Sequence, residues 1–104
     1  TGNVIVLTNR NSYSATTFFF FFLKALPHCT IFGDTTGGGG GVPMGGEMPN
    51  GWTYRFSVTK TIMPNGWDIE LGVPADIVID LDPVDEQNGV DTILEEALRI
   101  IEEE

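Results

Sequence analysis

The segment from Val4 to Gly41 constrains the fold of this chain most strongly. Val4–Leu7 and Thr30–Phe32 are short runs of β-branched and apolar residues, typical of strands buried on both faces of a parallel sheet. Residues 14–26 between them predict a helix, so the segment predicts a right-handed parallel βαβ unit. Because Phe18–Phe22 make this helix apolar around its whole circumference, we expect it to be buried on all sides.

The second half of the chain has a different pattern. The sequence MPNGW occurs at Met48–Trp52 and again at Met63–Trp67, and its Asn-Gly pair predicts type I′ turns. Apolar and polar residues alternate along residues 52–59, which predicts a half-buried strand. Residues 42–70 therefore predict an antiparallel meander, and Asp91 followed by an apolar stripe predicts a C-terminal helix. The two tryptophans are interpreted as packing residues, although exposed ones could line a substrate groove.

Ser14 stands at the predicted start of the first helix, where a serine has two possible uses. The first helical turn leaves backbone N–H groups unpaired, and the helix dipole favours negative charge there. The N–H of Ala15 could therefore face an oxyanion formed when Ser14 Oγ attacks a carbonyl. Alternatively, Ser12 or Ser14 caps the helix. Judged on these residues alone, capping is the favoured interpretation, because serine caps far outnumber serine nucleophiles.

A longer pattern extends across the chain: LTNRNSYSATTFF, then ALPHCTIFGDTTGGGGG, EMPNGW, TYRFS and IELGVPADI. This pattern resembles the C-terminal processing (tail-specific) serine peptidases, and more closely their tricorn-core-like branch. The resemblance implies an α/β fold of the ClpP/crotonase type, with Ser14 as the nucleophile. It also implies that the N–H of Ala15 helps to form the oxyanion hole and that Glu70 orients or polarises the base region. No cofactor is implied.

The glycine run after the second strand invites two interpretations. No Lys-Ser/Thr pair and no helix pattern follows it, so a phosphate-binding loop is disfavoured. The resemblance places the loop beside the nucleophile, where Gly37, Gly38, Gly39 and Gly40 would bind substrate. Residues without side chains let a peptide backbone approach closely, and an extended peptide could then add to the neighbouring strand.

The chain contains no evident base for Ser14. By the resemblance, the processing peptidases carry a lysine where Gly39 stands, and the tricorn-like branch uses an upstream histidine. Along a helix, His28 lies about 21 Å and Lys24 about 15 Å from Ser14, beyond hydrogen-bond reach. We therefore expect residues 1–104 to be a single partial catalytic domain, the nucleophile-bearing C-terminal half, whose partner is the N-terminal half. The resemblance implies a periplasmic or other extracytoplasmic bacterial location.

Charge and composition exclude several classes of function. Fifteen acids against five bases give a net charge of −10, which argues against binding nucleic acid or anionic membranes. One cysteine excludes an internal disulfide, and without a His/Cys cluster we expect no metal site. The resemblance therefore implies a serine endopeptidase that acts on peptides or unfolded proteins, and a homo-oligomer is a further expectation. A non-enzymatic module that binds an apolar ligand, or an inactive fragment or designed module on the same fold, remains the alternative.

Overall fold

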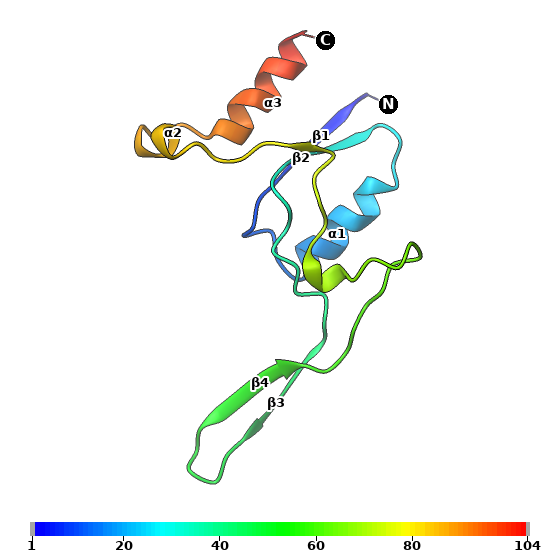
Figure 1. Cartoon of the computed structure of the whole chain (residues 1–104), viewed down its shortest axis with the longest axis vertical. Helices are drawn as coiled ribbons and strands as arrows, with labels where there is room; N and C mark the ends of the chain where they lie inside the picture. The colour runs from blue at the N-terminus through cyan, green and yellow to red at the C-terminus, as the bar shows by residue number, and fades with distance from the viewer. Residues whose placement is uncertain (1, 104) are drawn as a thin grey trace.

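The computed structural model describes residues 2–103, which form five strands, three α-helices and one short 3-10 helix (Figure 1). In chain order these are β1 (Val4–Thr8), α1 (Ala15–Lys24), β2 (Cys29–Gly33), β3 (Pro43–Glu47), β4 (Thr53–Ser57), η1 (Ile69–Leu71), β5 (Ile77–Val78), α2 (Pro83–Gln87) and α3 (Thr92–Glu103). The predicted α/β class is confirmed, with a parallel unit first, antiparallel strands next and a helix at the C-terminal end.

The first sheet is parallel and has the order β1-β2-β5. β1 pairs with β2 from Val4 opposite Cys29 to Thr8 opposite Gly33, and α1 connects the two strands. The predicted βαβ unit is therefore confirmed. The expected burial of the first strand on both faces is wrong in this chain, because β1 is an edge strand and its Val4 and Leu7 are exposed.

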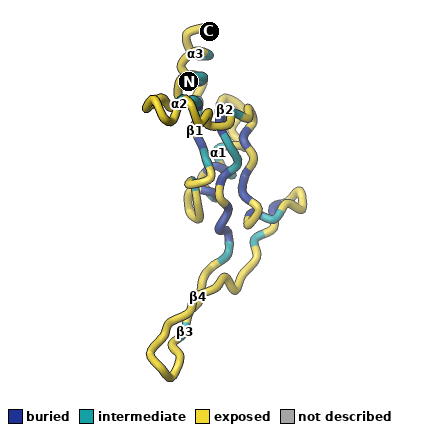
Figure 2. The backbone as a smooth tube through the Cα atoms, turned by 60° about the vertical axis from the view of Figure 1, so that its left-hand side comes forward, coloured by how far each residue is buried: buried dark blue, intermediate teal, exposed yellow. Residues whose placement is uncertain are grey.

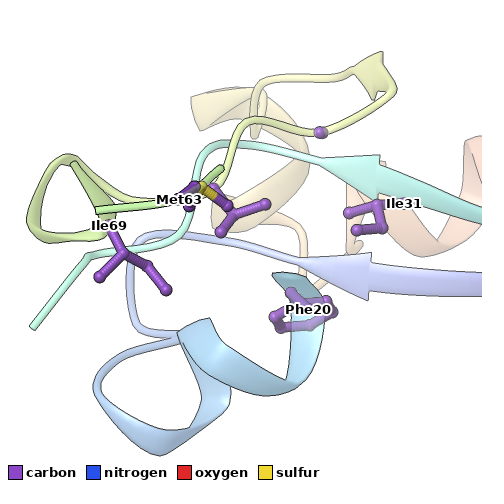
Figure 3. Packing of buried hydrophobic residues seen from close by; sticks show 6 residues of the cluster. Phe20, Ile31, Met63 and Ile69 are labelled. Carbon is purple, nitrogen blue, oxygen red and sulfur yellow. The ribbon is translucent and has the colours of Figure 1, made fainter. Parts of the chain in front are cut away.

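The hydrophobic core lies on both faces of β2. On one face, Ile31 packs in a cluster with Phe20 of α1 and with Met63 and Ile69 from the second half of the chain (Figure 3). On the other face, Phe32 packs against α3 in the following cluster: Phe32, Ile93 and Ala97. Neighbouring residues of the central strand thus point to opposite layers. For β2, the prediction of a strand buried on both faces of a parallel sheet is confirmed.

The phenylalanine run is helical, as predicted, but it is buried on one side only. Phe20 is 4% exposed, whereas Phe19 is 58% and Phe22 is 65% exposed. The reason is geometric, because α1 lies against the sheet with one face and no described element covers the opposite face. Residues 2–103 thus leave part of the apolar circumference of α1 in contact with solvent.

The antiparallel part is a hairpin, β3–β4, that projects away from the parallel sheet (Figure 2). Every residue of β4 is exposed, so the prediction of a half-buried strand is wrong: the alternation is present, but no element of residues 2–103 covers its apolar side. After β4 one isolated antiparallel bridge joins Ile62 to Asp68. Because of the projecting hairpin, the radius of gyration is 17.2 Å, against about 13 Å for a compact chain of this length.

The two MPNGW turns share one geometry, and it differs from the predicted type I′. Gly51 and Gly66 have positive φ, whereas Asn50 and Asn65 do not. In the first turn, the N–H of Gly51 donates to the Met48 carbonyl at 2.8 Å. This is a type I turn followed by a left-handed glycine, a three-residue hairpin connection. The proline before each asparagine explains the difference, because its fixed negative φ suits the first central position of a type I turn.

Candidate active site

Ser14 lies in a strained turn that leads into α1. Its backbone angles are φ 59° and ψ −119°, and it is the only non-glycine residue with positive φ among residues 2–103. Strain of this kind costs about 1–3 kcal/mol and is concentrated at functional sites. Ser14 is exposed and its side chain makes no capping hydrogen bond, while Ser12 Oγ accepts from the N–H of Asn9 instead. The interpretation of either serine as an ordinary cap of α1 is therefore wrong.

The glycine loop after β2 runs beside this turn and is hydrogen-bonded to it. The N–H of Ser14 donates to the Gly38 carbonyl at 2.8 Å, and the N–H of Gly37 donates to the Ser12 carbonyl at 2.8 Å. Thr17, which is fully buried in the first turn of α1, donates its hydroxyl to the Gly38 carbonyl at 2.7 Å. Together these bonds hold the start of α1 against the loop.

The N–H of Ala15 is available at the N-terminus of α1. Within the described range it has no hydrogen-bond acceptor, whereas the N–H of Thr17 donates to the Ser14 carbonyl at 2.9 Å. The helix dipole adds positive potential at this end. An unpaired donor directly after a nucleophilic serine is the group that stabilises an oxyanion in acyl transfer.

Ser14 lies on the wall of a hollow of about 350 Å³ between the glycine loop and the base of the hairpin. Three segments of the chain line this hollow, which we call the Ser14 hollow: Tyr13 and Ser14; Gly39, Gly41 and Pro43; Arg55, Phe56 and Ser57. Its size falls at the lower end of the range for ligand-binding clefts.

Of the four glycines predicted to bind substrate, Gly39 lines this hollow, and the other three are packed against the chain itself. A Cβ atom on Gly37 would overlap the Arg10 carbonyl, one on Gly38 the Glu70 carbonyl and one on Gly40 the Ile69 side chain. The glycines therefore permit close packing between the loop and its neighbours, a role that the sequence pattern did not indicate.

Gly39 also has no room for a side chain. Its φ is +77°, and a Cβ atom there would overlap the ring of Tyr13. A lysine at this position would need both a left-handed backbone and a displaced tyrosine. The local geometry is thus built around glycine and not around a loop lysine.

Glu70 is connected to the Ser14 hollow through Gly41. Its Oε2 accepts a hydrogen bond from the N–H of Gly41 at 3.0 Å, and Gly41 lines the hollow. Asp68 has a different role, because it accepts from the N–H of Glu70 at 3.0 Å and pairs with Lys60 at 3.2 Å. The N–H of Glu70, helped by Lys60, holds the pKa of Asp68 below its usual value. Of the two acids Asp68 and Glu70, it is Glu70 whose carboxylate lies beside the glycine loop.

The basic side chains considered as proton acceptors are all engaged or placed elsewhere. His28 follows the far end of α1 and is exposed. Lys24 donates to the Pro74 carbonyl and pairs with Asp76 at 3.3 Å. Lys60 forms the ion pair with Asp68 described above. None of the three contacts Ser14 in the hydrogen bonds and ion pairs of residues 2–103.

Four residues of this region were not singled out by the sequence analysis: Tyr13, Thr17, Arg55 and Ser57. For Thr17 a signal existed, since it follows Ser14 by three positions and so lies near it along the helix. Arg55 and Ser57 lie in a strand whose alternation predicted only packing, and their position beside Ser14 depends on the fold.

The described residues contain neither a metal-binding cluster nor a membrane-spanning helix. No three His, Cys, Asp or Glu side chains between residues 2 and 103 are grouped closely enough to hold a metal ion. In the same range no helix has the length and apolar character that a membrane span requires.

The family model for peptidase family S41 matches residues 1–79 of this chain. The chain therefore belongs to peptidase family S41, a family of serine-type peptidases that act on peptides. The predicted resemblance to C-terminal processing and tricorn-like peptidases is confirmed. A comparison with proteins of curated function gave no match.

Solved structures show the same fold. A candidate peptidase from Parabacteroides merdae is 44% identical, with a TM-score of 0.82, over 94% of this chain and 31% of that one. The tricorn protease matches with a TM-score of 0.77 and 24% identity, over 96% of this chain and 10% of that one. The photosystem II D1 C-terminal processing protease matches with a TM-score of 0.57 and 29% identity, over 75% of this chain and 20% of that one. The chain thus spans less than a third of each of these proteins.

Proposed function

We propose that this chain is the nucleophile-bearing part of a serine endopeptidase of the C-terminal processing, tricorn-like type. The observation that carries the proposal is Ser14 itself: exposed, held at positive φ, without a capping role and at the edge of a hollow. The strand–turn–helix position resembles that of the nucleophile in α/β-hydrolases. Peptides or unfolded proteins are the proposed substrates.

The proposed reaction is acyl transfer. Ser14 Oγ attacks the scissile carbonyl carbon while its proton passes to a base that residues 2–103 do not provide. The N–H of Ala15 donates to the oxyanion of the tetrahedral intermediate. When the intermediate collapses, the C–N bond breaks and the amine leaves with the proton from the base. Water then hydrolyses the acyl–Ser14 ester by the reverse proton path.

Labelling with a fluorophosphonate tests the assignment of the nucleophile. We expect the reagent to modify Ser14 when the chain is part of a polypeptide that also carries a histidine base upstream, and we expect Ser14→Ala to abolish the modification. Peptide mass spectrometry locates the label, and Ser12→Ala is the matched control because Ser12 lies in the same loop. A label on Ser12, or one that persists in Ser14→Ala, would contradict the proposal.

Glu70 is proposed to orient or polarise the base. We expect Glu70→Gln to lower kcat by about 10²-fold or more, because glutamine keeps an acceptor for the Gly41 N–H but removes the charge that would stabilise a protonated base. The melting temperature should stay within a few degrees. Glu47→Gln, at the end of β3, is the control for loss of one surface charge. Unchanged kcat in Glu70→Gln would remove Glu70 from the mechanism.

One observation favours a second function, the binding of an apolar ligand. A separate hollow of about 280 Å³ is lined mainly by apolar side chains, with Lys24 and Asn65 beside them: Phe21, Ala25, Met63, Trp67, Val73 and Pro74. Titration of retinol against tryptophan fluorescence tests this function. Saturable quenching that Met63→Gln removes, together with no label on Ser14, would favour the binding module over the peptidase.

A further inference from the structure

Among residues 2–103, carboxylates neutralise four of the five Lys and Arg side chains and leave one without an ion pair. Among residues 2–103 the ion pairs are Arg10–Asp34, Lys24–Asp76, Lys60–Asp68 and Arg99 with Glu96 and Glu103. Arg55 has no ion pair within this range, although the chain carries fifteen acids. An unpaired guanidinium in so acidic a chain can accept an anionic ligand without first breaking an internal ion pair.

This unpaired cation lies beside the candidate nucleophile. Arg55 lines the same hollow as Ser14, together with Ser57, which shares its face of β4. The residue opposite Arg55 on β3 is Gly45, which has no side chain to cover it. Because Arg55 is exposed and glycine stands opposite it, a ligand that enters the hollow from the hairpin side can reach this residue.

The neighbouring acids do not neutralise Arg55. Glu47 lies on the same face of the hairpin, one diagonal position away, but it forms no ion pair with Arg55 in the described residues. Glu70 accepts from the N–H of Gly41. On the glycine-loop side of the hollow, the Glu70 carboxylate would repel an anion, so the side lined by Arg55 is the more favourable position for negative charge.

We infer that Arg55 forms a carboxylate-binding subsite of the Ser14 hollow, which selects peptides with an acidic side chain or a C-terminal carboxylate near the scissile bond. The inference rests on the proposed peptidase function and adds a substrate preference to it. A guanidinium binds a carboxylate through two parallel, charge-assisted hydrogen bonds, which lysine cannot reproduce. Arg55 is thus a specificity residue and takes no part in bond breaking.

The test measures binding and not turnover, in the polypeptide that also carries the base upstream, with Ser14→Ala. The ligands are four acetylated alanine pentapeptides, with Glu or Gln at the centre and with a free or an amidated C-terminus. We expect one or both carboxylate groups to tighten binding about tenfold relative to the neutral peptide. The amidated Glu peptide and the free-acid Gln peptide separate the side chain from the C-terminus as the source.

Variants assign the preference to Arg55. Arg55→Gln should reduce the tenfold ratio to less than twofold and leave the affinity for the neutral peptide unchanged, whereas Arg55→Lys should retain only part of it. Arg99→Gln on α3 is the matched control, because it removes the same charge from a residue paired elsewhere. In ¹⁵N NMR spectra the Nε–H signal of Arg55 should shift on addition of the carboxylate peptides only.

The outcomes separate the two proposals. A tenfold preference that persists in Arg55→Gln, or equal binding of charged and neutral peptides, would overturn the subsite and leave the peptidase proposal intact. Failure of all four peptides to bind, while a fluorophosphonate still labels the same base-carrying polypeptide when Ser14 is intact, would also overturn the subsite alone. Failure to bind peptides and failure of the label together would overturn both.

Discussion

Residues 1–104 alone are expected to show no measurable peptidase activity, although they carry the candidate nucleophile. A serine hydroxyl is a weak nucleophile at neutral pH and needs a positioned base. His28 lies beyond the far end of α1, and Lys24 and Lys60 are held in ion pairs with Asp76 and Asp68. We therefore expect kcat/KM at least about 10⁴-fold below that of the same chain with a base supplied upstream.

The measurement is the rate of fluorophosphonate labelling and of fluorogenic peptide hydrolysis by the isolated chain. It should be made on the monomeric fraction from size-exclusion chromatography, because the exposed Phe19 and Phe22 favour self-association. Activity that disappears in Ser14→Ala would show that a base within the chain has been overlooked. The variants His28→Gln and Lys60→Gln would then identify it.

Gly38→Ala should destabilise the protein by about 3 kcal/mol or more and, in the polypeptide that carries the base upstream, abolish labelling of Ser14. Gly38 has a φ of +81°, and a Cβ atom there would overlap the Glu70 carbonyl oxygen. The loop must move away from η1, and the carbonyl that accepts from the N–H of Ser14 and the hydroxyl of Thr17 moves with it. Large losses of this kind arise when a side chain is forced against packed backbone.

A matched control separates strain from overlap. Gly51 in the hairpin turn has nearly the same φ, +84°, but no atom lies within 4 Å of a Cβ atom built on it. Gly51→Ala should therefore cost only the left-handed strain, about 1–2 kcal/mol. The free energy of unfolding from urea titration and the melting temperature measure both variants. Equal losses at the two positions would mean that packing of the glycine loop against η1 is not important.

The catalytic proposal depends on features that were partly readable in the sequence. Ser14 could be identified from the sequence because it stands between an apolar strand pattern and a helix pattern, and both patterns are local. Glu70 was assigned only through the family resemblance, and its hydrogen bond to Gly41 joins residues 29 positions apart. Arg55 gave no signal at all, since an arginine in an alternating strand is usually a solvated side chain.

Three features follow from local sequence patterns: the order of elements, the helical state of the phenylalanine run and the position of the turns. These depend on periodicity and on turn residues within a few positions of one another, which any chain with this sequence would share. Even there the predicted type I′ turn is wrong, because Pro49 and Pro64 favour a type I turn.

The apolar surfaces that are covered, and the loops that meet, depend instead on how the elements are arranged in three dimensions. β1 became an edge strand and β4 became exposed on both faces because burial depends on whether another layer packs there, and no local pattern states that. The strained turn at Ser14 is likewise maintained by the Gly38 carbonyl, 24 residues away, which accepts from its N–H. Contacts over such separations arise from the packing of the whole chain, and they are what place Ser14, Gly41 and Arg55 around one hollow.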